Sequence, residues 1–346
     1  MKKILSFLAA VMALTACNKE FNKVGSDLGQ KSEEKVPVSV SIRNVATKAG
    51  ESGPEDIINS LTVILYRIVD GAKTYESFYE FMPSASEGTI YIDPSKEADS
   101  YYIAAYANVE GLSTSSYNQD WTRFSEESIG DFQMFGEFTK AKDDLLSSGK
   151  AEVSLQRQCS KVTVEKISLE WINAANAHKQ FKVKSLYLMD VPGVFENVHK
   201  ASFDLDSRDL WYNTNGYDKD GDQDVLLYSK ATDIIVTETA AYDTDHTFYG
   251  YISSENAVNS TASWKPSDTR LVIEADFDGE TCYYAIRINR ENLEKVRNKH
   301  FVFKNIVITR PGADEPYEAL TTEEDIIVTL AVSPWEVKTY DRVEVI

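Results

Sequence analysis

Two stretches near opposite ends of the chain show the same alternation of apolar and polar residues. The first spans residues 36–43, and its apolar positions are Val36, Val38, Val40 and Ile42. The second spans residues 326–333, and its apolar positions are Ile326, Val328, Leu330 and Val332. Because successive side chains of a strand point to opposite faces, each pattern predicts a half-buried strand. Two such strands could compete for one groove, or each could be an ordinary edge strand of a single monomer.

Short strands separated by turns are predicted over most of the remaining chain. They cover residues 60–69, 75–82, 88–92, 101–108, 152–155, 164–171, 181–191, 224–229, 247–252, 270–276, 281–289 and 302–309. Asp70-Gly71 and the run from Asp276 to Glu280 predict tight turns between strands. Residues 113–146 are less regular and predict a loop with short helical turns. The pattern favours an all-β fold with two β-sandwiches in series.

The predicted organisation has five parts. A leader covers residues 1–17, and a polar tether with the first strand covers 18–48. The first sandwich covers 49–154 and the second covers 155–319, followed by a C-terminal segment at 320–346. We expect this last segment to serve a neighbouring subunit and not the folding of its own.

The first seventeen residues predict export. Lys2 and Lys3 precede an apolar run, residues 4–14, that is too short to span a bilayer. The run ends in Leu14-Thr15-Ala16-Cys17, which resembles the lipobox of bacterial lipoproteins. That resemblance implies cleavage before Cys17, lipid on its sulfur and attachment to a membrane through the lipid. The alternative is an ordinary signal peptide with an incidental cysteine.

Composition limits the classes of partner and chemistry. The chain has 346 residues, 42% of them hydrophobic, which is enough to build real cores. A net charge of -19 is unsuited to nucleic acid, which binds basic surfaces. Cys159 and Cys282 could form a disulfide or lie buried and unpaired, and we favour the unpaired state.

Catalytic and metal-binding patterns are weak in this sequence. Its histidines are scattered and have no metal-ligand spacing: His178, His199, His246 and His300. No nucleophile motif accompanies them, so we expect neither an enzyme nor a cofactor. One acidic run provides oxygen ligands at alternate positions: Asp218, Asp220, Asp222 and Asp224. Its glycine stands fourth and Ser229 occupies position 12, unlike an EF-hand, so weak Ca²⁺ binding competes with a solvated turn.

A series of segments, in order, resembles the fimbrillins, the family of major fimbrial subunits that build type V pili. Near the N-terminus these are the lipobox, Val38-Ser39-Val40-Ser41-Ile42, Thr47-Lys48-Ala49 and residues 61–66. Farther along they are residues 155–162, 248–249 with 255–256, 296–312 and the strand 328–335 that ends in Pro334-Trp335. The resemblance extends from the lipobox to the C-terminus.

This resemblance implies two transthyretin-like β-sandwich domains and a pilus subunit delivered to the outer membrane as a lipoprotein. It implies that a trypsin-like protease then removes the first strand. Lys48 matches the cleavage position, with Ala49 as the new N-terminus, although characterised relatives are cut after arginine. Arg43, followed by Asn44, is the alternative site. The vacated groove would take the C-terminal strand of a neighbouring copy, with Trp335 as an anchor at its end.

Partners and role follow from the same resemblance. Other copies of the chain and related pilus subunits would form a head-to-tail polymer at the cell surface, which could bind a host or bacterial ligand. The alternatives are a tip adhesin, an anchor subunit or a glycan-binding surface lipoprotein. Sugar stacking would use aromatic residues in loop-like stretches, namely Trp121, Trp211, Tyr212 and Trp264.

Overall fold

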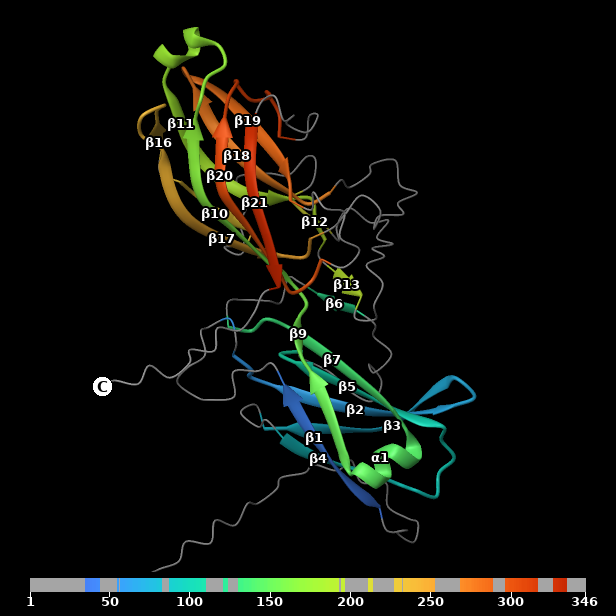
Figure 1. Cartoon of the computed structure of the whole chain (residues 1–346). Helices are drawn as coiled ribbons and strands as arrows, with labels where there is room; N and C mark the ends of the chain where they lie inside the picture. Colours follow the sequence, from blue (N-terminus) through green and yellow to red (C-terminus); the bar gives the residue numbers. More distant parts are fainter. Residues whose placement is uncertain are drawn as a thin grey trace, which may run out of the picture.

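The computed structural model describes residues 35–43, 55, 57–82, 87–109, 121–123, 130–192, 194–196, 211–213, 227–231, 233–252, 268–288, 296–316 and 326–334. Most of these residues lie in strands that gather into two groups of sheets (Figure 1). We call the group formed mainly by the first half of the chain the first unit and the other group the second unit. The predicted boundary between residues 154 and 155 falls between the strands β8 and β9.

The first unit consists of two sheets that face each other. The smaller sheet has the order β4-β1-β8, with β4 (Glu87–Ile92), β1 (Val36–Arg43) and β8 (Lys150–Ser154). The larger has the order β3-β2-β5-β7-β9, with β3 (Ala72–Phe81), β2 (Leu61–Val69), β5 (Ser100–Ala107), β7 (Met134–Ala141) and β9 (Gln156–Arg157). Their inner faces share one apolar core, which includes Val63, Ile90 and Ile103.

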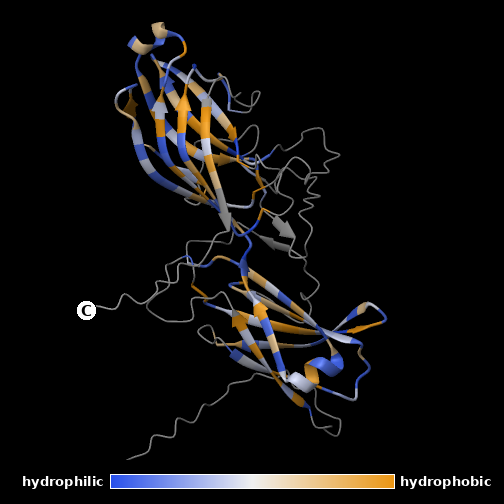
Figure 2. Ribbon diagram, viewed as in Figure 1, coloured by the Kyte–Doolittle hydropathy of each residue, from blue (hydrophilic) through white to orange (hydrophobic). Residues whose placement is uncertain are grey.

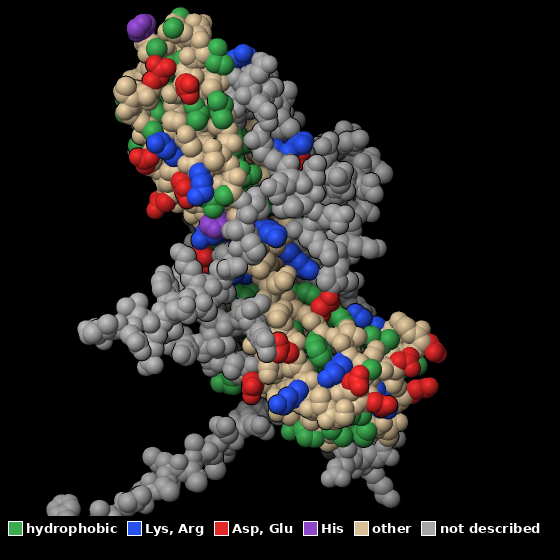
Figure 3. Space-filling model, viewed as in Figure 1, with side chains coloured by type: hydrophobic (Ala, Val, Ile, Leu, Met, Phe, Trp, Pro, Cys, Tyr) green, Lys and Arg blue, Asp and Glu red, His purple; other side chains and the backbone are tan. Residues whose placement is uncertain are grey.

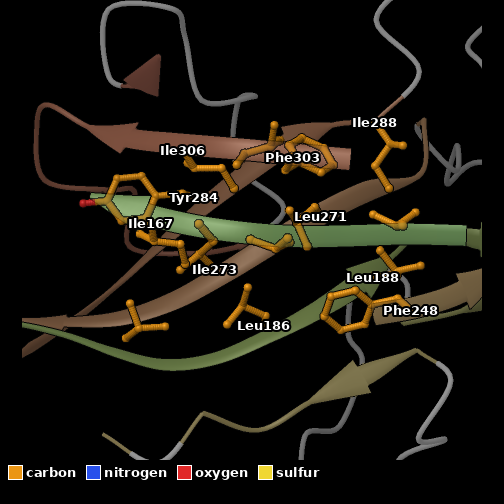
Figure 4. Packing of buried hydrophobic residues seen from close by; sticks show 14 of the residues in the cluster. Ile167, Leu186, Leu188, Phe248, Leu271, Ile273, Tyr284, Ile288, Phe303 and Ile306 are labelled. Atoms are coloured by element: carbon orange, nitrogen blue, oxygen red, sulfur yellow. The ribbon is translucent and has the colours of Figure 1, made fainter. Parts of the chain in front are cut away.

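The second unit is the larger sandwich. One sheet has the order β17-β10-β20-β21, with β17 (Tyr242–Gly250), β10 (Ser160–Leu169), β20 (Lys299–Ile308) and β21 (Ile326–Pro334). The other has the order β15-β11-β18-β19, with β15 (Tyr228–Ser229), β11 (Phe181–Met189), β18 (Arg270–Phe277) and β19 (Glu280–Arg287), and β16 (Ile234–Val236) also pairs with β11. Figure 4 shows the aliphatic and aromatic side chains packed between these sheets. Figure 2 shows hydrophobic and hydrophilic residues alternating along several of the strands.

Smaller elements complete the described part. A short helix, α1 (Lys142–Ser148), connects β7 to β8, and a 3-10 helix spans Ala174–His178. Two short antiparallel pairs are β12 (Val191–Pro192) with β14 (Trp211–Tyr212), and β6 (Trp121–Arg123) with β13 (Val194–Glu196). No helix among the described residues is long and apolar enough to cross a membrane.

The predicted all-β architecture is confirmed, and so are both tight turns. Asp70 and Gly71 connect β2 to β3 with φ values of 49° and 78°. Asp278 and Gly279 connect β18 to β19 with φ values of 58° and 93°. Both residues of each turn have positive φ, which suits the right-handed twist of the flanking strands. Cys159 and Cys282 are both buried and form no disulfide with each other, as favoured from the sequence.

The prediction of a loop with short helical turns over residues 113–146 is wrong for Met134–Ala141, which form β7, whereas α1 agrees with the predicted helical turns. β7 pairs with the full length of β5, from Ser100↔Ala141 to Ala107↔Met134. Its side chains do alternate, because Met134 packs into the inner core and Phe135 into the outer face of the sheet. Gly136 interrupts that alternation in the sequence. In the structure a Cβ at Gly136 would collide with the backbone carbonyl of Ser154.

Candidate functional site

The candidate site is the groove that β1 fills in the first unit. β1 runs antiparallel to β4, from Val36↔Ile92 to Ser41↔Glu87. It runs parallel to β8, from Ser39↔Lys150 to Arg43↔Ser154. In Figure 1, β1 accordingly lies between these two strands. Loss of β1 would leave both neighbours with unpaired backbone groups on the edges that now face it.

The apolar side chains of β1 point into the core. Val38 and Val40 are fully buried and Ile42 is 3% exposed, whereas Val36 is half-buried. The intervening Ser39 and Ser41 are half-exposed on the other face. The alternation seen in the sequence is therefore present in the structure, and three of its four apolar positions are core residues. Burying each such side chain contributes about 1.5–3 kcal/mol.

The smallest residues that line the groove lie beside Val40. This residue is paired with Gly88 on β4 and with Ala151 on β8. The ring of Phe81 occupies the space where a Cβ at Gly88 would stand, which explains the glycine at this position. Phe81 belongs to the partly buried residues that pack on the first core.

Helix α1 supports the end of the groove near Ser39. Its Leu145 is fully buried in the first core, and Gly149 ends the helix with a left-handed φ of 59°. The carbonyl of Gly149 accepts a hydrogen bond of 2.9 Å from the backbone N–H of Ser39. The turn into β8 thus contributes to the pairing of β1.

The C-terminal strand β21 lies at an edge of the second unit. It runs antiparallel to β20, from Ile308↔Ile326 to Lys299↔Pro334. Val328 and Leu330 are half-buried against the second core, whereas Ile327 is 53% exposed. The predicted alternation is present here as well. The sequence predicts that this segment serves a neighbouring subunit and not the folding of its own. In this structure β21 pairs with β20 of its own second unit, and its donation to a neighbour stays a prediction.

Several predicted site residues lie outside the described residues. These are Cys17, Asn44, Lys48, Ala49, Trp264, Trp335, His199 and the acidic run with Asp218, Asp220, Asp222 and Asp224. Arg43 is the last residue of β1. Trp121 and Trp211 lie in the short strands β6 and β14 and not in loops, and Tyr212 packs against the second core.

Two histidines bridge strands of the second unit, which sequence reasoning did not predict. His246 on β17 contacts the Ser229 hydroxyl on β15 through Nδ1 at 2.7 Å and the Tyr242 hydroxyl through Nε2 at 2.6 Å. Burial lowers the pKa of His246 below its ordinary value. The Nε2 of His300 lies 2.9 Å from the Thr163 hydroxyl. Within the described part of the chain, no group of three or more His, Cys, Asp or Glu side chains could hold a metal ion.

Comparison with known proteins gives similarity at the level of structure. No family model and no curated protein matches the sequence. The fimbrilin from Porphyromonas gingivalis aligns with a TM-score of 0.54 at 17% identity, covering 87% of this chain and 98% of its own. This chain has the fold of that fimbrilin.

Two further solved structures have the same fold. A candidate cell adhesion protein from Bacteroides eggerthii aligns with a TM-score of 0.58 at 16% identity, covering 87% of this chain and 96% of its own. Another, from Parabacteroides distasonis, aligns with a TM-score of 0.55 at 13% identity, covering 89% of this chain and 98% of its own. The fold expected from the fimbrillin resemblance is therefore confirmed.

Proposed function

We propose that this chain is a structural subunit of a surface fimbria that supports adhesion and assembles by strand exchange. The observation that carries the proposal is the central place of β1, whose buried Val38, Val40 and Ile42 lie between β4 and β8. In this proposal β1 fills the groove of the precursor and prevents premature assembly. Its removal then opens the groove to a strand from another copy. The fimbrilin fold of the chain supports the same role.

Strand addition suits such a groove for physical reasons. Main-chain hydrogen bonds to β4 and β8 would bind any strand of suitable length, and the apolar pockets would select its side chains. The proposed donor is β21 of a second copy. Its Val328 and Leu330 would leave the core of their own second unit and pack in the groove. A donor at one end and a groove at the other make a head-to-tail contact that extends into a filament.

Export and processing complete the proposal. The lipobox ending at Cys17 would deliver the precursor to the outer membrane as a lipoprotein. Cleavage after Lys48 would detach β1 together with the lipid and leave Ala49 as the first residue. Cleavage after Arg43, leaving Asn44, would also detach β1.

The proposal is tested by processing the purified precursor with trypsin, which cuts after both lysine and arginine. We expect filaments in electron microscopy and Ala49 as their first residue in N-terminal sequencing. Filaments that begin at Asn44 would move the site to Arg43. Filaments that retain an uncut, lipidated N-terminus would contradict the proposal.

A competing peptide tests the groove itself. An excess of the peptide 36–43 added during processing should refill the groove and stop filament growth. The same peptide with Val40→Asp is the matched control and should not, because its carboxylate would be buried without a partner. Equal growth with both peptides would contradict assembly through this groove.

A further inference from the structure

A short segment before β2 contacts both units, and we call it the strap. It consists of Glu55 and residues 57–60. On the side of the second unit, the Glu55 carboxylate accepts hydrogen bonds from Lys161 Nζ at 2.6 Å and from the Tyr249 hydroxyl at 2.5 Å. On the side of the first unit, the backbone carbonyl of Glu55 accepts a 3.0 Å hydrogen bond from Nε of Arg157 on β9.

The two side chains that bind the Glu55 carboxylate are placed by the second unit's own sheet. Lys161 stands near the start of β10 and Tyr249 near the end of β17, and they are paired directly across these antiparallel strands. The Lys161–Glu55 ion pair is mostly shielded, since its side chains are 20% and 22% exposed. Burial raises the pKa of Tyr249 above its ordinary value, which keeps its hydroxyl a neutral donor.

The other end of the strap is fixed to the first unit. The Asn108 side chain, buried at the end of β5, accepts a 2.7 Å hydrogen bond from the Asn59 N–H. The same side chain donates to the carbonyl of Ile57 at 2.8 Å and to that of Phe132 at 3.0 Å. Asn108 holds a left-handed φ of 57°, which asparagine tolerates better than most residues.

Two further contacts join the units beside the strap. The rings of Phe132 and Tyr249 lie 4.8 Å apart between centroids. Arg297, which precedes β20, donates to the Gln158 side chain at 3.3 Å. Burial lowers the pKa of Arg297, and the nearby Glu137 carboxylate on β7 opposes that shift. Carboxylates of the first unit and the strap thus face cations of the second.

We infer that the strap locks the two units together, so that they move as one stiff body. Contacts at a single point would allow a hinge, but Glu55, Phe132 and Arg297 hold the junction at separate places. The lock is independent of strand exchange. It would also outlast cleavage at Lys48 or Arg43, because the strap follows both sites in the chain.

The lock is tested by exchanging charges across the ion pair in the purified full chain. Glu55→Lys and Lys161→Glu should each broaden the interparticle distance distribution in small-angle X-ray scattering and enlarge the radius of gyration. Each should also divide a single thermal transition into two. The double exchange restores opposite charges and should recover most of the original behaviour, as a double-mutant cycle requires for a direct interaction.

Lys166→Met provides the matched control. Lys166 also lies on β10 and pairs with Asp243 on β17 at 3.9 Å, but in an exposed position away from the junction. The Lys166→Met substitution should leave the scattering profile and the thermal transition unchanged. The inference is overturned if the single exchanges resemble this control, or if the double exchange is no better than either single one.

Discussion

Position 40 shows how one side chain depends on its surroundings in this molecule. Val40 is fully buried between Gly88 and Ala151, whereas its neighbour Ser39 is half-exposed on the opposite face. Both positions are paired with β4 and β8, and they differ in the face of the sheet to which their side chains point. They therefore form a natural pair for testing how much the groove depends on apolar packing.

We expect Val40→Asp to destabilise the precursor by more than about 2 kcal/mol, since a carboxylate would enter an apolar core without a partner. Ser39→Asp, the control, should change the free energy of unfolding by less than about 0.5 kcal/mol, as is usual for surface substitutions. Urea denaturation of the uncut chain measures both. Equal losses would mean that β1 is not anchored by its inward face.

His246 gives the second unit a pH-dependent contact. Because burial lowers its pKa in the folded state, the unfolded chain binds the proton more readily. The pKa of His246 in the unfolded chain is about 6.5. The stability that depends on neutral His246 is therefore present above that pH, and it is lost as the pH falls from there toward the lower pKa of the folded state.

We accordingly expect the wild type to lose more stability than His246→Asn between about pH 8 and about pH 5. His178→Asn, an exposed position on the 3-10 helix, should follow the wild type. Denaturant midpoints of the three proteins across this range give the comparison. Parallel curves for the wild type and His246→Asn would show that the bridge between Ser229 and Tyr242 is insensitive to protonation.

At the scale of elements, the two alternating strands occupy unlike positions. β1 is the middle strand of its sheet and is paired on both sides, whereas β21 is an edge strand paired only with β20 in the described structure. An edge strand is easier to detach than a central one, because only one ladder of hydrogen bonds must break. This asymmetry suits a subunit in which β21 leaves its own sheet and β1 needs a protease to leave.

Leu330→Asp should therefore have two effects. It should lower the stability of the second unit by about 1–3 kcal/mol, since Leu330 is half-buried in its own core, and it should prevent filament formation. Ile327→Asp, on the exposed face of the same strand, should do neither. Thermal melts and electron microscopy after processing separate the effects. Normal filaments from Leu330→Asp would exclude β21 as the donor.

At the scale of the whole molecule, two sandwiches share one chain and carry mixed surface charge. Figure 3 shows acidic and basic side chains interspersed over the visible face of both units, without one dominant patch of either sign. The net charge of -19 gives the chain an acidic balance, which favours solubility through self-repulsion. Attachment to a membrane would then depend on the leader and its cysteine.

Cys17→Ala should abolish lipidation and surface delivery, because the thiolate is the group that would receive the lipid. Metabolic labelling with a palmitate analogue, followed by surface proteolysis of whole cells, measures both steps. Cys159→Ala is the control, since that thiol is buried in the second core and should leave the label in place. Undiminished label in Cys17→Ala would reject the lipoprotein prediction.

Local chemistry was enough to predict much of this fold. The alternation at residues 36–43 and 326–333 identified the buried faces of β1 and β21, because side-chain direction in a strand depends only on position along it. Asp70-Gly71 and Asp278-Gly279 marked their turns, since few other residues adopt positive φ without strain. These signals are contained in neighbouring residues and need no knowledge of the rest of the chain.

Tertiary structure decided the features that depend on distant partners. The sequence could not tell that β1 would be central and β21 peripheral, because alternation shows which face is buried and not which strands lie alongside. The sequence did not reveal β7, because Gly136 interrupts its alternation of apolar and polar residues. The reason for that glycine, the close approach of the Ser154 backbone, is present only in the folded chain. Glu55 looked like any polar residue near a turn, yet its partner Tyr249 lies 194 positions away. Such pairings are fixed by how the sheets pack, and only the folded chain brings them together.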